Sequence, residues 1–143
     1  MALPILTHSR SGFPLITTET PKLRKRGGIN KDGYLTLYPR YCYGWIFSDK
    51  ELEAMSMERF GHPDAHKNAL LAVRERWEAA GGSPDDLDYT HKRLGQHSEI
   101  FLYVSDNTTR KKLNRPSDAE FLAKAKAATG KEEDGKWYHM DTF

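Results

Sequence analysis

The segment that most constrains the fold is residues 34–47, which read YLTLYPRYCYGWIF. Pro39 and Gly44 would interrupt a helix here, and the aromatic and β-branched content is typical of strands. Alternate side chains of an extended chain point to opposite faces. The odd-numbered positions are all apolar or aromatic, whereas the even-numbered positions are mixed. We therefore predict strands near 34–38 and 40–47, with the odd-numbered face buried and the even-numbered face open to a partner.

Start and stop signals after this segment predict helices. Ser48 and Glu51 can form a capping box, as can Ser117 and Glu120, and Ser83 with the following proline predicts a third helix start. The predicted helices are 49–60, 63–80, 84–94 and 118–129, and a further strand is predicted at 98–104. Strands and helices do not alternate regularly, so we expect an α+β fold with a small antiparallel or mixed sheet packed by about four helices.

The length of 143 residues is typical of one domain. Prolines and glycines punctuate residues 1–33, which we predict to be an irregular N-terminal arm. Residues 34–130 are the predicted globular domain. Residues 131–143 form a charged and then aromatic tail, expected to dock on the domain or to reach a partner.

A single cysteine, Cys42, excludes an internal disulfide. No basic and apolar leader opens the sequence, and its apolar runs are too short to span a membrane. These features favour an intracellular protein, cytoplasmic or nuclear, with no membrane partner. Cys42 is not followed by a helix start that would activate its thiol, so we expect it to be buried and inert.

No motif in the sequence names a reaction, and whether the chain is an enzyme stays open. Phosphate loops, dinucleotide fingerprints and nucleophile elbows are missing from the sequence, so we expect no cofactor. His62 and His66 are four residues apart, which is a spacing for two metal ligands on a helix. No third ligand follows from the pattern, and a helix cap and a solvent-facing histidine explain the pair, so we predict no metal site.

The net charge is only +2, but it is unevenly distributed. Residues 1–48 carry seven Lys and Arg against two acids, and the remainder carries fifteen against eighteen. Two basic runs, 22–31 and 109–115, suit phosphate contact or, alternatively, solvated loops. The candidate partner-binding residues are Tyr34, Tyr38, Arg40, Lys22, Arg24, Lys25, Arg26, Arg110, Lys111 and Lys112.

These features favour a small interaction or regulatory domain that binds another protein. One alternative is a nucleic-acid-binding protein that uses the two basic runs, which would flank the sheet if they folded onto one side. Another alternative is a small enzyme or small-ligand binder with an aromatic-lined pocket between the sheet and the helices.

Overall fold

The computed structural model describes residues 7–8, 14–24, 26–29, 31–37, 39–62, 65–94 and 97–140. The strands are β1 (Thr7–His8), β2 (Pro14–Thr17), β3 (Arg26–Ile29), β4 (Leu35–Leu37), β5 (Tyr41–Ser48), β6 (Asp88–Leu94), β7 (His97–Asp106) and β8 (Lys136–His139). The helices are α1 (Asp49–Phe60), α2 (Ala65–Ala79), α3 (Arg110–Asn114) and α4 (Ala119–Thr129), with 3-10 turns η1 (Pro84–Asp86) and η2 (Arg115–Ser117). The predicted α+β class is confirmed.

Six strands form an antiparallel sheet in the order β1-β2-β8-β5-β7-β6. Strand β5 lies inside this sheet, with Trp45 opposite Leu102 of β7 and Cys42 opposite Tyr138 of β8. The register of β5 against β7 shifts at Gly44, where a Cβ atom would lie 2.0 Å from the Leu102 carbonyl oxygen. The close approach of the two backbones therefore requires glycine at this position.

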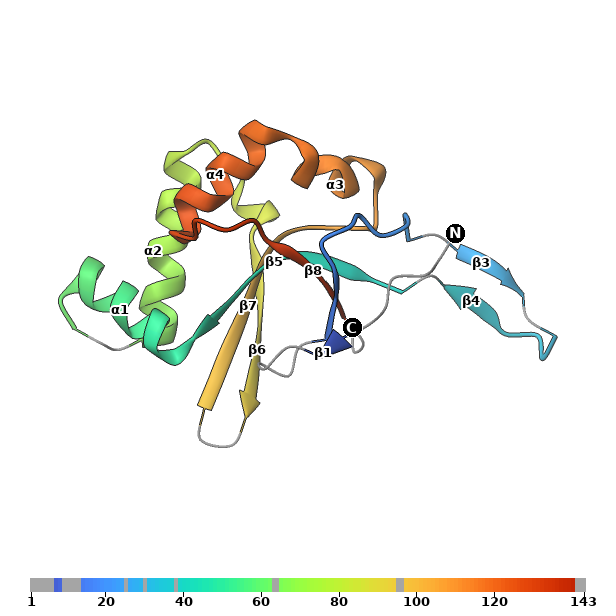
Figure 1. Ribbon diagram of the computed structural model, residues 1–143, viewed down its shortest axis with the longest axis horizontal. Coiled ribbons are helices and arrows are strands. Elements are labelled where there is room, and N and C mark those ends of the chain that lie inside the picture. Colours follow the sequence, from blue (N-terminus) through green and yellow to red (C-terminus); the bar gives the residue numbers. More distant parts are fainter. Residues whose placement is uncertain are drawn as a thin grey trace.

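The main hydrophobic core lies between this sheet and the helices, which gather on one side of it (Figure 1). Tyr43, Trp45 and Phe47 supply the sheet side of the core, and Val73 and Trp77 of α2 supply part of the helix side. The prediction that the odd-numbered face is buried is therefore confirmed for Tyr43, Trp45 and Phe47, whereas Tyr41 is partly buried and Pro39 is exposed. Burial of such large aromatic side chains dominates the stability of a small core.

A second, smaller core lies on the opposite face of the sheet and contains Cys42, Phe101, Tyr138 and Met140. Cys42 is fully buried, and burial raises the pKa of its thiol to about 12. The prediction that Cys42 is buried is confirmed, and a raised pKa disfavours the reactive thiolate. At Cys42 the even-numbered face of β5 is thus core, and it is not open to a partner.

The boundary between β5 and α1 is the one that the sequence predicts. The Ser48 hydroxyl accepts from the Glu51 amide at 3.3 Å, and the Glu51 carboxylate accepts from the Ser48 amide. Gly61 ends the helix with a φ of 77°, a left-handed conformation that glycine adopts without strain.

Three details of the predicted elements are wrong. Ser83 caps only the single turn η1, and the rest of the predicted helix 84–94 is strand β6, because it pairs along its whole length with β7. The cap of α4 is Asp118, which accepts from two amides of the first turn, and Ser117 lies in η2. The strand predicted near 34–38 is β4, which belongs to a separate sheet.

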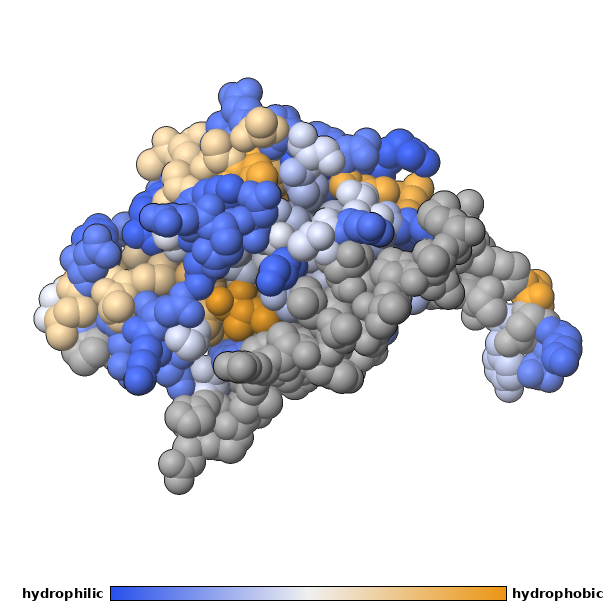
Figure 2. Space-filling view, viewed as in Figure 1, coloured by the Kyte–Doolittle hydropathy of each residue, from blue (hydrophilic) through white to orange (hydrophobic). Residues whose placement is uncertain are grey.

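Strands β3 and β4 form this two-stranded sheet, a hairpin that projects from the body at the end far from α1 (Figure 1). Ile29 and Tyr34, near its turn, are 73% and 71% exposed. Hydrophobic and hydrophilic surface lie side by side at this tip (Figure 2). None of the helices in the described part of the chain is long and apolar enough to cross a membrane.

Candidate functional site

Asn107, at the end of β7, joins three segments that are distant in the sequence. Its side chain is fully buried. The amide nitrogen donates to the carbonyl oxygens of Lys22 at 2.9 Å and Pro39 at 3.0 Å, and the amide oxygen accepts from the Tyr41 N–H at 2.8 Å. The Asn107 backbone carbonyl accepts from the Arg24 N–H at 2.6 Å. Asn107 thus holds Lys22 and Arg24, at the start of the first basic run, beside the end of β7.

The second basic run starts two residues after Asn107, at Thr109, which caps α3. The two runs, separated by about 85 residues in the sequence, therefore meet at one end of the sheet. We call this region the basic end, and its residues with described side chains are Lys22, Arg24, Arg40, Arg110, Lys111, Lys112 and Arg115. Lys22, Arg110 and Lys111 are exposed.

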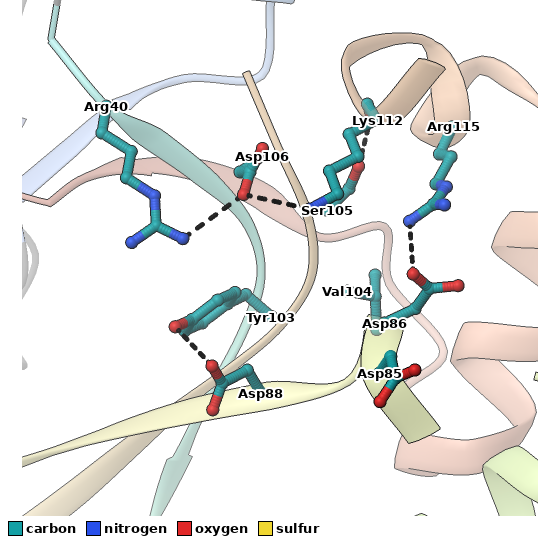
Figure 3. A pocket seen from close by; sticks show the side chains of 10 residues that line it. All are labelled: Arg40, Asp85, Asp86, Asp88, Tyr103, Val104, Ser105, Asp106, Lys112 and Arg115. Atoms are coloured by element: carbon teal, nitrogen blue, oxygen red, sulfur yellow. Dashed lines mark hydrogen bonds and ion pairs between the residues drawn. The ribbon is translucent and has the colours of Figure 1, made fainter. Parts of the chain in front are cut away.

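A small polar pocket lies beneath the basic end (Figure 3). Arg40 and Lys112 approach the Asp106 carboxylate from two sides, at 3.3 and 4.0 Å (Figure 3). Arg115 pairs with Asp86 at 2.9 Å, across the gap between η2 and η1. The pocket volume is about 80 Å³, which is room for two or three water molecules.

The charges in this pocket hold one another in place. Burial by itself would raise the pKa of Asp106, but hydrogen bonds from Thr108 and the nearby cations Lys112 and Arg40 outweigh it and lower the pKa below its usual value. Asp106 is therefore ionised at neutral pH. It fixes Arg40, whose guanidinium also lies 5.9 Å from the centre of the Tyr103 ring.

Tyr103 closes the lower side of the pocket and donates a hydrogen bond to Asp88 at 3.2 Å (Figure 3). Burial, with the Asp88 charge as a second cause, raises the pKa of Tyr103 to about 12. The pocket thus holds fixed ion pairs and a neutral phenol, with little space left for a substrate. Chemically it is a set of ion pairs that holds Arg40, Lys112 and Arg115 in place.

The surface charge is polarised along the molecule. Helix α1, which lies at the end far from the hairpin, contains four acids against two basic residues (Figure 1). Helix α3, toward the other end, contains three basic residues and no acid. A chain with a net charge of only +2 therefore presents a basic face locally.

The structure brings together six of the predicted partner-binding residues, namely Lys22, Arg24, Arg40, Arg110, Lys111 and Lys112. Tyr34 is exposed but lies on the projecting hairpin. Arg26 starts β3, and its side chain is outside the described part. Lys25 and Tyr38 lie outside the described residues.

Sequence reasoning missed the residues that organise this region. Asn107 and Asp106 lie in the run SDNTT, whose composition indicates only a polar turn. Asx side chains in such runs often bind nearby backbone groups, as Asp106 does with the Thr108 N–H at 2.9 Å. No local sequence pattern indicates which distant backbone groups the Asn107 side chain binds.

Comparison with known proteins adds no family to this description. The chain matches no family model, no curated protein and no solved structure. The described residues contain no cluster of three or more metal-ligand side chains. His62 is exposed just after α1, and its carbonyl accepts from the Ser56 hydroxyl, whereas the His66 side chain lies outside the described part.

Proposed function

We propose that the protein binds nucleic acid through the basic end. The observation that carries the proposal is the junction at Asn107, which places the backbone of Lys22 and Arg24 beside the start of α3. Phosphate contacts supply most of the affinity of non-specific nucleic-acid binding, and a surface that gathers two basic runs offers several such contacts.

The cations of this surface have two roles. Exposed Lys22, Arg110 and Lys111 are accessible to phosphates. Arg40 and Lys112 are held by Asp106, so they lose little side-chain freedom when a phosphate approaches. The acidic helix α1 at the far end would orient the protein as it approaches a polyanion.

The hairpin of β3 and β4 extends this surface. Its Tyr34 side chain is 71% exposed, and an exposed aromatic ring can stack on an unpaired base. A two-stranded ribbon is marginally stable in water by itself, so contacts with a bound partner would stabilise it.

The test is fluorescence anisotropy with a labelled single strand of about 16 nucleotides, titrated between about 50 and 200 mM KCl. We expect the affinity to fall steeply with salt. The double variant Arg110→Ala/Lys111→Ala should reduce the slope of log K against log salt by about 1.4. The control Lys50→Ala/Lys67→Ala removes the same charge from α1 and α2 and should leave the slope unchanged. A wild-type affinity that does not respond to salt would refute the proposal.

A protein partner is the second candidate. Ile29 is 73% exposed on the hairpin, whose first strand lies within the first basic run, and this combination suits a partner with an acidic surface and an apolar contact. A labelled acidic peptide in the same titration distinguishes the two. Salt-sensitive binding of the peptide, together with no binding of nucleic acid, would replace the first candidate by the second.

A further inference from the structure

A second and larger pocket lies beside the basic end, between the segment after β2, the start of α4 and the loop that leads into β8. Its volume is about 360 Å³, within the range of about 300–1,000 Å³ that small-molecule sites occupy. The lining residues are Thr18, Thr20, Tyr43, Pro116, Ser117, Leu122, Asp134, Gly135, Lys136 and Trp137.

The floor of this pocket is rigid. The rings of Tyr43 and Trp137 pack edge to face at 5.4 Å, and both residues are nearly fully buried in the main core. Gly135 lies so close to Tyr43 that a Cβ atom would approach the ring to 2.8 Å. A fixed floor costs little ordering when a ligand enters.

The lining is polar but balanced in charge. Burial, with Asp134 as a second cause, raises the pKa of Tyr43 to about 12, so its phenol is neutral at physiological pH. Asp134 forms an ion pair with Lys126, and Lys136 is the one cation among the described residues that line the pocket. Three hydroxyl residues, Thr18, Thr20 and Ser117, add hydrogen-bonding groups. This lining suits a neutral, planar molecule with polar edges, whereas a phosphate would need more positive charge.

The pocket is continuous in sequence with the basic end. Thr20 precedes Lys22 by two residues, and Ser117 follows Arg115 by two. We propose that an unpaired base of the nucleic acid bound at the basic end enters this pocket, so that the protein selects single strands over duplexes. The inference rests on the proposed function. It adds selectivity, because bases of a duplex are stacked and paired and cannot enter without unstacking.

The first experiment compares wild-type protein with three labelled ligands of equal length at one salt concentration. These are a single strand, a duplex, and a single strand in which abasic sites replace alternate nucleotides. We expect the intact single strand to bind about tenfold more tightly than either of the others. Equal affinity for the intact and the abasic strand would overturn the inference. Loss of salt-dependent binding to all three would instead refute the proposed function.

The second experiment fills the pocket. Ser117→Trp adds bulk at its edge, and Glu120→Trp adds the same side chain to the exposed surface of α4 as a control. Ser117→Trp should reduce the preference for single strand over duplex to about twofold or less and leave the salt slope unchanged, whereas Glu120→Trp should keep both. If Ser117→Trp loses its native circular dichroism, Thr20→Trp replaces it. A pocket-filling variant that folds and retains the full preference would count against the base site.

Discussion

Replacing Asn107 by alanine tests the junction that holds the two basic runs together. The substitution removes the side-chain amide but leaves the backbone of residue 107 in place. Three backbone groups then lose their partner: the Lys22 carbonyl, the Pro39 carbonyl and the Tyr41 N–H.

The expected cost follows from these three hydrogen bonds. A polar group left without its partner in a partly buried setting costs about 1–3 kcal/mol. Three such groups give a loss of about 3 kcal/mol at the low end, if the structure relaxes and water reaches some of them. For a domain of this size, 1 kcal/mol corresponds to about 2–4 °C in Tm, so the midpoint should fall by roughly 6–12 °C.

Urea unfolding followed by tryptophan fluorescence measures this difference directly. Asn114→Ala is the matched control, because Asn114 is exposed and its side chain makes no capping hydrogen bond at η2. The control should change the free energy of unfolding by less than about 0.5 kcal/mol. A loss below about 1 kcal/mol for Asn107→Ala would show that the junction is not what fixes the first basic run.

Two further predictions concern buried ionisable groups. With a pKa of about 12, the Cys42 thiol should react with a disulfide reagent at pH 8 at least ~100-fold more slowly in the folded than in the urea-unfolded protein, and equal rates would contradict its burial. Asp106→Asn should lower the free energy of unfolding at pH 7 by about 1–2 kcal/mol, because it removes the charge that pairs with Arg40 and Lys112. The pKa of Asp106 is lower in the folded than in the unfolded protein, so this stabilisation is present above the unfolded pKa and is lost as the pH falls through the folded pKa. Urea unfolding below about pH 4 should therefore show a smaller difference in the free energy of unfolding between variant and wild type. A difference that does not change with pH would assign the effect to the hydrogen bonds from Thr108 and not to charge.

Local signals predicted those parts of the fold that local interactions decide. The capping box at Ser48 and the glycine at Gly61 bound α1 as expected, because both act within one helical turn. The alternation of residues 40–47 also predicted which side of β5 carries Tyr43, Trp45 and Phe47, since a strand has only two faces.

The prediction of a helix over 84–94 was wrong because the start signal at Ser83 acts over only one turn. Ser83 and Pro84 produce η1 as they would begin a helix. The following residues then pair with β7, with Asp88 opposite Tyr103 and Leu94 opposite His97, and a ladder of this length outweighs weak helix propensity.

The sequence predicted which cations belong to the site, but it did not predict the contacts that bring them together. Six of the expected partner-binding residues do meet, but nothing in the sequence near Lys22 indicates that its carbonyl binds Asn107, about 85 residues later. Likewise, β8 has only four residues, too few to show the alternating pattern of a strand, and its place in the sheet depends on pairing with β2 and β5.

The position of β8 also has a consequence for how the chain folds. In the described part of the sheet, β2 reaches β5 and β7 only through β8, which comes about 120 residues later in the sequence. At a synthesis rate of about 5–20 residues per second, β2 waits roughly 6–24 s on the ribosome before its neighbour emerges. During that interval β5, β7 and the helices can assemble, while the edge of β5 that β8 will cover stays open. The nascent chain is therefore most exposed to wrong strand pairing at this edge, and folding should finish with the insertion of β8.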